Sequence, residues 1–431
     1  MNHQAKALNE RIINKNESVY HMLSDRGRNL YFPYQGILGQ GAAAKGKTYN
    51  ATIGLANEDD GSPMRLSYFD TFPLAPAEVL PYAPSQGLPA LRQRWKELIY
   101  EKNKSLSGID ISQPVVTQAL THGISLAAQL FLNPGEEVVI PTPFWDNYSL
   151  IFQECTGARI HSFSCFENGA FNLKGFSQCL EERKGKKVVF LFNAPNNPTG
   201  YTPTEVEAER IVELCKSSAE QGTQIVFIAD DAYFGLVYES GVVLESLFAM
   251  LARAHENILA VKVDGVTKED YAWGLRVGFM TFAVKDGDSE FYKALEDKVS
   301  GLIRGMISNC SQMSQSVVLK ALTHPDYQPN KEAKYATLKQ RYETLKHELS
   351  NHPEYGAMFK PVPYNSGYFM CLELDKTLDS EKVRQRLLNH YDTGVVVLGP
   401  LVRVAFSCVA EPKIPELIKN IYQACLDLKS A

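Results

Sequence analysis

The chain has 431 residues, of which 45% are hydrophobic and 22% charged, a composition that excludes a disordered or fibrous protein. It carries 44 Lys and Arg against 49 Asp and Glu, for a net charge of −5, which argues against a protein that binds nucleic acid or membrane surfaces. The length predicts two or three domains with a large core.

The N-terminal residues are polar and charged, so they lack the apolar run of a signal peptide. No apolar run approaches the ~20 residues that cross a bilayer, and we expect no membrane segment. The eight cysteines, from Cys155 to Cys425, are scattered without the spacing of a metal site or a disulfide framework. We therefore expect reduced thiols, no bound metal and a cytoplasmic location.

Between Leu91 and Phe282, short apolar runs alternate with helical periods, which predicts a largely parallel sheet covered by helices. Most runs are continuously apolar, as in strands buried on both faces. A helix over Thr204–Gln221 opens with a capping box, because Glu207 follows Thr204 by three residues. The predicted strands are Pro114–Leu120, Glu137–Pro141, Ala158–Phe163, Lys187–Phe192, Gln224–Ala229, Ile258–Val263 and Leu275–Phe282.

The pattern changes after a long helical stretch near Leu302–Leu322, and we expect a separate α+β domain at the C-terminus. The large domain is predicted over residues 71–310. Residues 1–70 form the N-terminal segment and part of the small domain, and residues 311–431 form the rest of it. The predicted C-terminal elements are helix Asn330–Leu349, strand Gly367–Leu374, helix Ser380–His390, strands Val395–Leu398 and Val402–Phe406, and helix Lys413–Leu428.

Polar motifs follow two neighbouring strands. The loop Asn193–Gly200 places Asn197 at the carboxyl end of a strand, where open α/β sheets bind ligands. The alternative is an ordinary turn, since Asn, Pro and Gly are turn formers. The next strand ends in Asp230 and Asp231, which face opposite ways, so at most one points into a pocket. A buried carboxylate needs a cation, which makes it a site candidate, although a turn or helix cap is the alternative.

A third strand leads to Lys268, and Arg276 follows eight residues later. Such a lysine is either a surface residue that extends its amine to water or a nucleophile of depressed pKa. Three successive strand ends thus supply an Asn, an Asp with Tyr233 nearby, and a Lys followed by an Arg.

In this order and spacing, the motifs resemble the class I/II aminotransferases, pyridoxal-phosphate enzymes of fold type I. The likeness runs from about Asn50 to Ser407. It implies an α/β fold with a large domain, in which a mostly parallel seven-stranded sheet lies in an α/β/α sandwich, and a smaller α+β domain.

The resemblance implies three catalytic residues, Lys268, Asp230 and Tyr233. Lys268 resembles the lysine that binds pyridoxal phosphate covalently and then shuttles a proton, which requires a neutral amine. Asp230 resembles the carboxylate that keeps the pyridine nitrogen protonated, so that the ring accepts electrons. Tyr233 and Asn197 are similar to the two donors that bind the phenolic oxygen of the cofactor.

A phosphate site is also implied. Arg276 matches its arginine, whose planar fork meets two oxygens at once. Thr121, His122 and Gly123 fall where backbone N–H groups bind the same phosphate at a helix N-terminus. For the His122 side chain we favour a place at the helix start without a catalytic part.

The family pattern is broken beside the lysine. Gly265 stands three residues before Lys268, where a Ser or Thr commonly binds the phosphate. Thr267 or Thr121 would then bind the phosphate in place of that residue. The segment Asp264–Tyr271 is also unusually acidic.

Further residues match the remainder of the site. Trp145 resembles the aromatic residue that stacks on the pyridine ring, with a core tryptophan as the alternative. Tyr82 matches a tyrosine that reaches the cofactor phosphate of the other subunit, which implies a homodimer with shared sites; the alternative is packing in its own subunit. Arg403 resembles the clamp of the substrate α-carboxylate, with Asn197 and the segment around Gly54 beside it.

The chain is therefore predicted to be a pyridoxal-phosphate-dependent aminotransferase that moves an amino group between an L-amino acid and a 2-oxo acid. Glutamate, aspartate and aromatic amino acids are candidate donors. A C–S lyase or decarboxylase on the same fold stays open, because the cofactor chemistry is shared. An alternative from another class is a non-catalytic, cofactor-binding regulatory protein.

Overall fold

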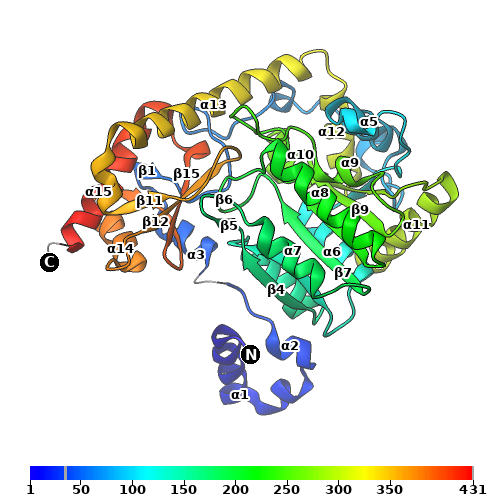
Figure 1. Ribbon diagram of the computed structural model, residues 1–431, viewed down its shortest axis with the longest axis horizontal. Helices are drawn as coiled ribbons and strands as arrows, with labels where there is room; N and C mark the ends of the chain where they lie inside the picture. Colours follow the sequence, from blue (N-terminus) through cyan, green and yellow to red (C-terminus); the bar gives the residue numbers. More distant parts are fainter. Residues whose placement is uncertain (34–35, 430–431) are drawn as a thin grey trace.

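A seven-stranded sheet forms the centre of the larger part of the molecule (Figure 1). The computed structural model describes residues 1–33 and 36–429. Strand order is β2-β10-β9-β8-β7-β3-β4, with β10 antiparallel to both neighbours and parallel pairing from β9 to β4. The predicted α/β fold with a mostly parallel sheet is confirmed. The strands are β2 Val115–Thr117, β3 Glu137–Thr142, β4 Arg159–Ser164, β7 Lys187–Asn193, β8 Gln224–Asp230, β9 Ile258–Gly265 and β10 Gly278–Ala283.

Helices cover both faces of this sheet (Figure 1). Helix α8 packs against α7 and α9, whereas α6 packs on β9 and β10 and against α11. The predicted capping box starts α8: Thr204 Oγ1 accepts the Glu207 N–H at 3.2 Å, and the Glu207 carboxylate accepts the Thr204 N–H at 2.8 Å. The helices are α4 Pro76–Val79, α5 Pro89–Lys102, α6 Ala119–Phe131, α7 Leu173–Glu181, α8 Glu205–Glu220, α9 Leu247–Leu251, α11 Ser289–Met306 and α12 Gln312–Leu322.

A smaller antiparallel sheet, with strand order β11-β12-β15-β14, lies beside the large one. The 25-residue helix α13 packs against α15 and begins next to the large sheet (Figure 1). Strand β1 (Tyr49–Asn50) pairs with β13 (Thr393–Gly394), so the N-terminal segment joins the C-terminal part. The division at residues 70 and 310 stays a prediction. The other elements are β11 Phe359–Pro361, β12 Phe369–Leu374, β14 Val396–Leu398, β15 Leu401–Ala405, α13 Tyr327–Asn351, α14 Ser380–His390 and α15 Ile414–Lys429.

Two N-terminal helices, α1 (His3–Met22) and α2 (Asp25–Asn29), lie apart from both sheets (Figure 1). The sequence pattern had not predicted them. Helix α3 (Ile37–Ala43) lies beside the smaller sheet. Across residues 1–33 and 36–429, no helix combines the length and the apolar character needed to cross a membrane.

Several predicted elements have different boundaries. The strand expected over Leu275–Phe282 begins at Gly278, because Trp273–Leu275 form a 3-10 turn. The strand expected over Pro114–Leu120 stops at Thr117, because the chain enters α6 at Ala119, whose φ is 62°. The helical stretch near Leu302–Leu322 is divided into α11 and α12 by a turn at Ser308, whose φ is 69°. An apolar run alone does not show where a buried strand passes into a buried helix.

Candidate active site

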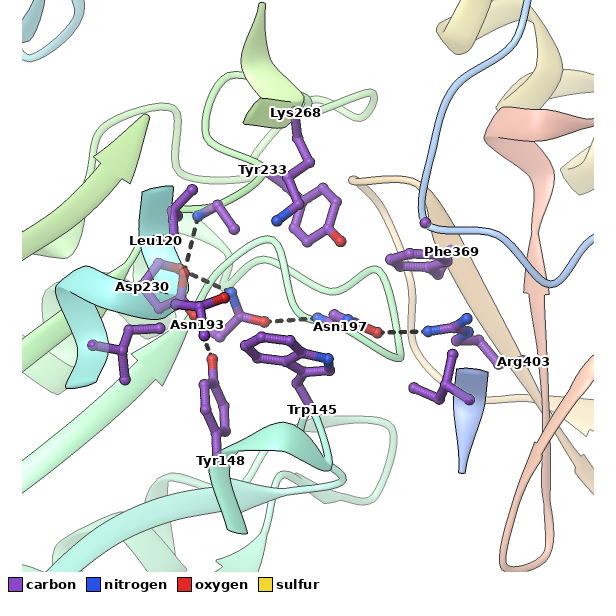
Figure 2. A pocket seen from close by; sticks show the side chains of 15 residues that line it. Leu120, Trp145, Tyr148, Asn193, Asn197, Asp230, Tyr233, Lys268, Phe369 and Arg403 are labelled. Atoms are coloured by element: carbon purple, nitrogen blue, oxygen red, sulfur yellow. Dashed lines mark hydrogen bonds between the residues drawn. The ribbon is translucent and has the colours of Figure 1, made fainter. Parts of the chain in front are cut away.

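A cavity of about 210 Å³ lies at the carboxyl ends of β7 and β8 and is closed by residues of the smaller sheet (Figure 2). Open α/β sheets bind ligands at this edge. Of the residues singled out in the sequence, those that line it are Gly54, Thr121, Trp145, Asn197, Asp230, Tyr233, Lys268 and Arg403.

Lys268 enters the cavity from α10 (Val266–Glu269), a single turn that follows β9. Its Nζ lies 5.4 Å from the centre of the Tyr233 ring. Burial lowers the pKa of Lys268 to about 8, an effect that Asp230 opposes and Arg276 reinforces. A substantial fraction of the amine is therefore neutral near physiological pH, as a nucleophile requires.

Asp230 ends β8 on the floor of the cavity and is 3% exposed. It accepts hydrogen bonds from Tyr148 Oη and, at 3.2 Å, from the Ala232 N–H. Burial raises the pKa of Asp230 to about 6, although the Tyr148 bond and Lys268 both act to lower it. Asp231 faces the other way, as expected, and pairs with the buried Lys262.

Arg403 closes the opposite end of the cavity and is 1% exposed (Figure 2). Its Nη1 donates to Asn197 Oδ1 at 3.1 Å, and its Nη2 donates to the Thr52 carbonyl at 2.8 Å. The guanidinium lies 4.4 Å over the Phe369 ring. Within the described part of the chain, Arg403 forms no salt bridge and its Nε has no hydrogen-bond partner. Asp146 interacts with Arg403 only at longer range. A buried cation without a close counter-ion is costly, so this end of the cavity is suited to an anionic ligand.

Two polar residues that line the cavity, Tyr148 and Asn193, were not predicted as site residues from the sequence. Tyr148 lies three residues after Trp145, and the two rings meet edge to face at 5.5 Å. This helical spacing could have indicated it. Asn193 joins the two ends of the cavity, because its amide donates to the Asp230 carbonyl at 2.9 Å and its Oδ1 accepts the Asn197 N–H at 2.7 Å.

His122 and Gly123 do not line the cavity. His122 Nδ1 accepts the Gln118 N–H at 3.0 Å at the start of α6, while the buried Nε2 has no partner among the described residues. A Cβ at position 123 would lie 2.7 Å from Val263 Cγ1. This glycine therefore lets α6 approach β9.

The glycine at the usual serine position has a packing reason. A Cβ at Gly265 would lie 2.6 Å from the Cα of Gly278, its partner on β10, and 2.7 Å from the Val277 carbonyl oxygen. A serine does not fit there. Thr267 is 2% exposed, and its hydroxyl lacks a partner within the described residues.

Arg276 and Tyr82, like His122, Gly123 and Thr267, lie outside the cavity. Arg276 has a left-handed backbone (φ 54°) and is half-buried, which lowers its pKa. It is near enough to lower the pKa of Lys268 as well. Tyr82 is 90% exposed and does not line the cavity of its own chain.

The chain is similar to known proteins in sequence and in fold. The family model described as aminotransferase class I and II matches residues 74–421. An aspartate aminotransferase of Bacillus sp. (strain YM-2) is 26% identical over 305 residues, which cover 68% of each chain. Two solved structures share the fold: an aminotransferase from Anaerococcus prevotii (TM-score 0.80, 22% identity, 93% of this chain and 98% of that one) and the kynurenine aminotransferase of Pyrococcus horikoshii in complex with PMP (TM-score 0.78, 18% identity, 96% and 99%).

Proposed function

This chain belongs to the class I and II aminotransferases, and we propose that it transfers amino groups between an amino acid and a 2-oxo acid with pyridoxal phosphate bound at Lys268. One observation carries the proposal. A lysine amine of lowered pKa, a buried carboxylate and a buried arginine without a described counter-ion line the same cavity. The lysine amine could react with the aldehyde of the cofactor, the carboxylate could bind its ring nitrogen, and the arginine could bind the carboxylate of the substrate.

The residues of the cavity fit the cofactor. The Lys268 amine would bond to its aldehyde carbon, and Asp230 would bind its ring nitrogen. Tyr233 and Asn197 would donate to the phenolic oxygen, and Trp145 would supply an aromatic face.

The phosphate would be held by a second group of residues. We assign to it Arg276, the start of α6 at Thr121–Gly123, and the Thr267 hydroxyl. The unpartnered hydroxyl of Thr267 supports its part. Neither Arg276 nor Thr267 lines the cavity itself, so this is the least complete side of the proposed site.

Each group then has a task in the reaction. Bound pyridoxal phosphate supplies a ring that accepts electrons when the substrate Cα–H bond breaks. Arg403 binds the substrate carboxylate and, with Asn197 and the segment at Gly54, fixes the direction of that bond. Once the substrate amine has replaced it at the aldehyde carbon, the freed Lys268 Nζ would move the proton from Cα to that carbon. Asp230 holds a proton on the ring nitrogen.

Neither the family nor its relatives named aminotransferases favour a C–S lyase, a decarboxylase or a regulator. The test is an absorbance scan of the purified protein with a panel of amino acids that includes glutamate, aspartate and aromatic ones. Loss of the visible cofactor band together with formation of the matching 2-oxo acid supports the proposal. Release of pyruvate and ammonia would indicate a lyase. Covalent capture of the cofactor by Lys268→Ala would contradict the assignment.

We also propose a cytoplasmic homodimer. Tyr82 and Leu80, which are 90% and 79% exposed, support a contact with a second copy in which Tyr82 reaches the other cofactor. All eight cysteines are free thiols, which fits a reducing compartment. Light scattering of the purified chain tests the dimer, and a monomer that is fully active would refute the shared site.

A further inference from the structure

The residues next to Lys268 form a buried cluster of charges that the reaction itself does not use. Glu269 and Asp270 follow the lysine and are 2% and 1% exposed. We propose that Lys331 is a positioning residue for Lys268, because it binds both carboxylates and so fixes the turn that carries the amine. The inference rests on the role proposed above for Lys268.

Lys331 lies near the start of α13 and reaches both carboxylates with one ammonium group. Its Nζ is 2.7 Å from Glu269 Oε1 and 3.1 Å from Asp270 Oδ1. Glu269 Oε1 also accepts a bond from Lys102 at the end of α5, and Asp270 Oδ1 accepts one from Tyr327 Oη at 2.7 Å. The turn is thereby tied to two helices.

Helix α10 is too short to hold its position by itself. It has four residues and no side-chain cap at its first turn, whereas isolated helices below about 12 residues are marginal in water. A further side-chain bond comes from Tyr368 Oη, which donates to the Lys268 carbonyl at 2.8 Å. The direction of Lys268 therefore depends on the groups that bind the turn.

The cluster acts on Lys268 through geometry rather than through its own charge. Two ammonium groups face two carboxylates, so the charges balance. The charged groups that shift the pKa of Lys268 are instead Asp230 on β8 and Arg276; the aromatic ring that faces its amine is Tyr233.

Loss of Lys331 would upset this balance. Lys102 would be the one ammonium group left beside the two carboxylates, and of these it pairs with Glu269 and not with Asp270. Their other oxygens, Oε2 and Oδ2, already lack a partner in the described chain. Since an uncompensated buried carboxylate is strongly unfavourable, the turn would shift toward water and carry the amine with it.

Lys334 offers a matched control on the same helix. It forms an ion pair of 2.6 Å with Glu58, and both side chains are about one quarter exposed. It therefore loses a comparable contact when replaced, but its partner lies outside the turn of Lys268.

The experiment compares Lys331→Met, Lys331→Arg and Lys334→Met with the wild type. In the cofactor-free full chain, acylation of Lys268 by a small reagent is followed by mass spectrometry over a range of pH, which gives the pKa of the amine. In the loaded enzyme, kcat and KM are measured with one amino acid. Thermal unfolding of each variant separates loss of fold from loss of position.

We expect Lys331→Met to move the pKa of Lys268 back toward its ordinary value and to lower kcat by about 10- to 100-fold, with KM within about twofold. Lys331→Arg should recover most of kcat, and Lys334→Met should match the wild type. If Lys331→Met does not fold, the charge-balanced double variant Lys331→Met, Asp270→Asn replaces it. We expect the same shift in the pKa of Lys268 and the same fall in kcat.

The proposal is overturned if Lys331→Met, folded, keeps the wild-type pKa of Lys268 and the wild-type kcat. It is also overturned if Lys334→Met changes the pKa of Lys268 and kcat as much as Lys331→Met does. A wild-type chain that reacts with no amino acid would instead refute the proposed function, while acylation of Lys268 would still report on its position.

Discussion

Replacement of Tyr148 by Phe isolates the effect of one hydrogen bond on the carboxylate at the cavity floor. Asp230 accepts one side-chain bond, from Tyr148, and one backbone bond, from Ala232. A hydrogen bond to a charged group contributes about 1.5–3 kcal/mol, and one pKa unit corresponds to about 1.4 kcal/mol. The pKa of about 6 for Asp230 already includes the lowering by the Tyr148 bond, so loss of this bond should raise the pKa by about one to two units.

The consequence can be read from the ionised fraction. At pH 7, a carboxyl of pKa about 6 is roughly nine-tenths ionised, and one of pKa about 7.5 is roughly one-quarter ionised. The Tyr148→Phe enzyme should therefore hold a proton on the ring nitrogen less well at neutral pH and recover as the pH rises. The KM for the amino acid should change little, because Arg403 is untouched.

The assay is carbon-13 NMR of aspartate-labelled, cofactor-free protein, with Asp230→Asn to assign the signal. Tyr100→Phe is the control, since it also removes a tyrosine hydroxyl bond, the partly buried one to the Ile109 carbonyl at 2.7 Å, while Tyr100 does not line the cavity. A midpoint for Asp230 that is the same in Tyr148→Phe and Tyr100→Phe would refute the reasoning.

Three further predictions follow from the site. The rate at which cofactor-free protein captures pyridoxal phosphate should rise with pH through about 8, because burial lowers the pKa of Lys268 and the neutral amine reacts; a flat profile followed by absorbance would contradict this. Arg403→Lys should raise KM by about 10- to 100-fold, since one ammonium cannot replace a two-pronged clamp; unchanged saturation kinetics would exclude the clamp. Gly265→Ser should lower unfolding stability by about 1–3 kcal/mol in a denaturant titration, because its Cβ meets Gly278, whereas Gly274→Ser, with open space around it, should not.

The fold was predictable where local pattern decides it. The capping box at Thr204 marked the start of α8, and continuous apolar runs marked the central strands. The end of the first strand was not predictable, because Ala119 adopts a positive φ that tertiary packing imposes. The turn at Ser308 was hidden in the same way.

Some residues of the candidate site could also be predicted from local pattern, and others could not. Residues at strand ends, such as Asn197, Asp230 and Lys268, could be found from the sequence, because the ends of adjacent parallel strands meet at one edge. The partner of Asp230 could not, since Tyr148 lies 82 residues away and meets it only in the folded chain. The acidic pair after Lys268 is visible in the sequence. Its cations could not be predicted, because they come from α5 and α13, 167 and 62 residues away from Glu269.

The two bonds that hold Arg403 have a consequence for how the protein is made. They join residues 351 and 206 positions apart, and contacts between such distant segments form late, because a long loop must close first. During synthesis from the N-terminus, the strands that carry Asn197, Asp230 and Lys268 leave the ribosome before Arg403 does. A growing chain can thus complete the cofactor side of its cavity before the arginine of the substrate side has been synthesised.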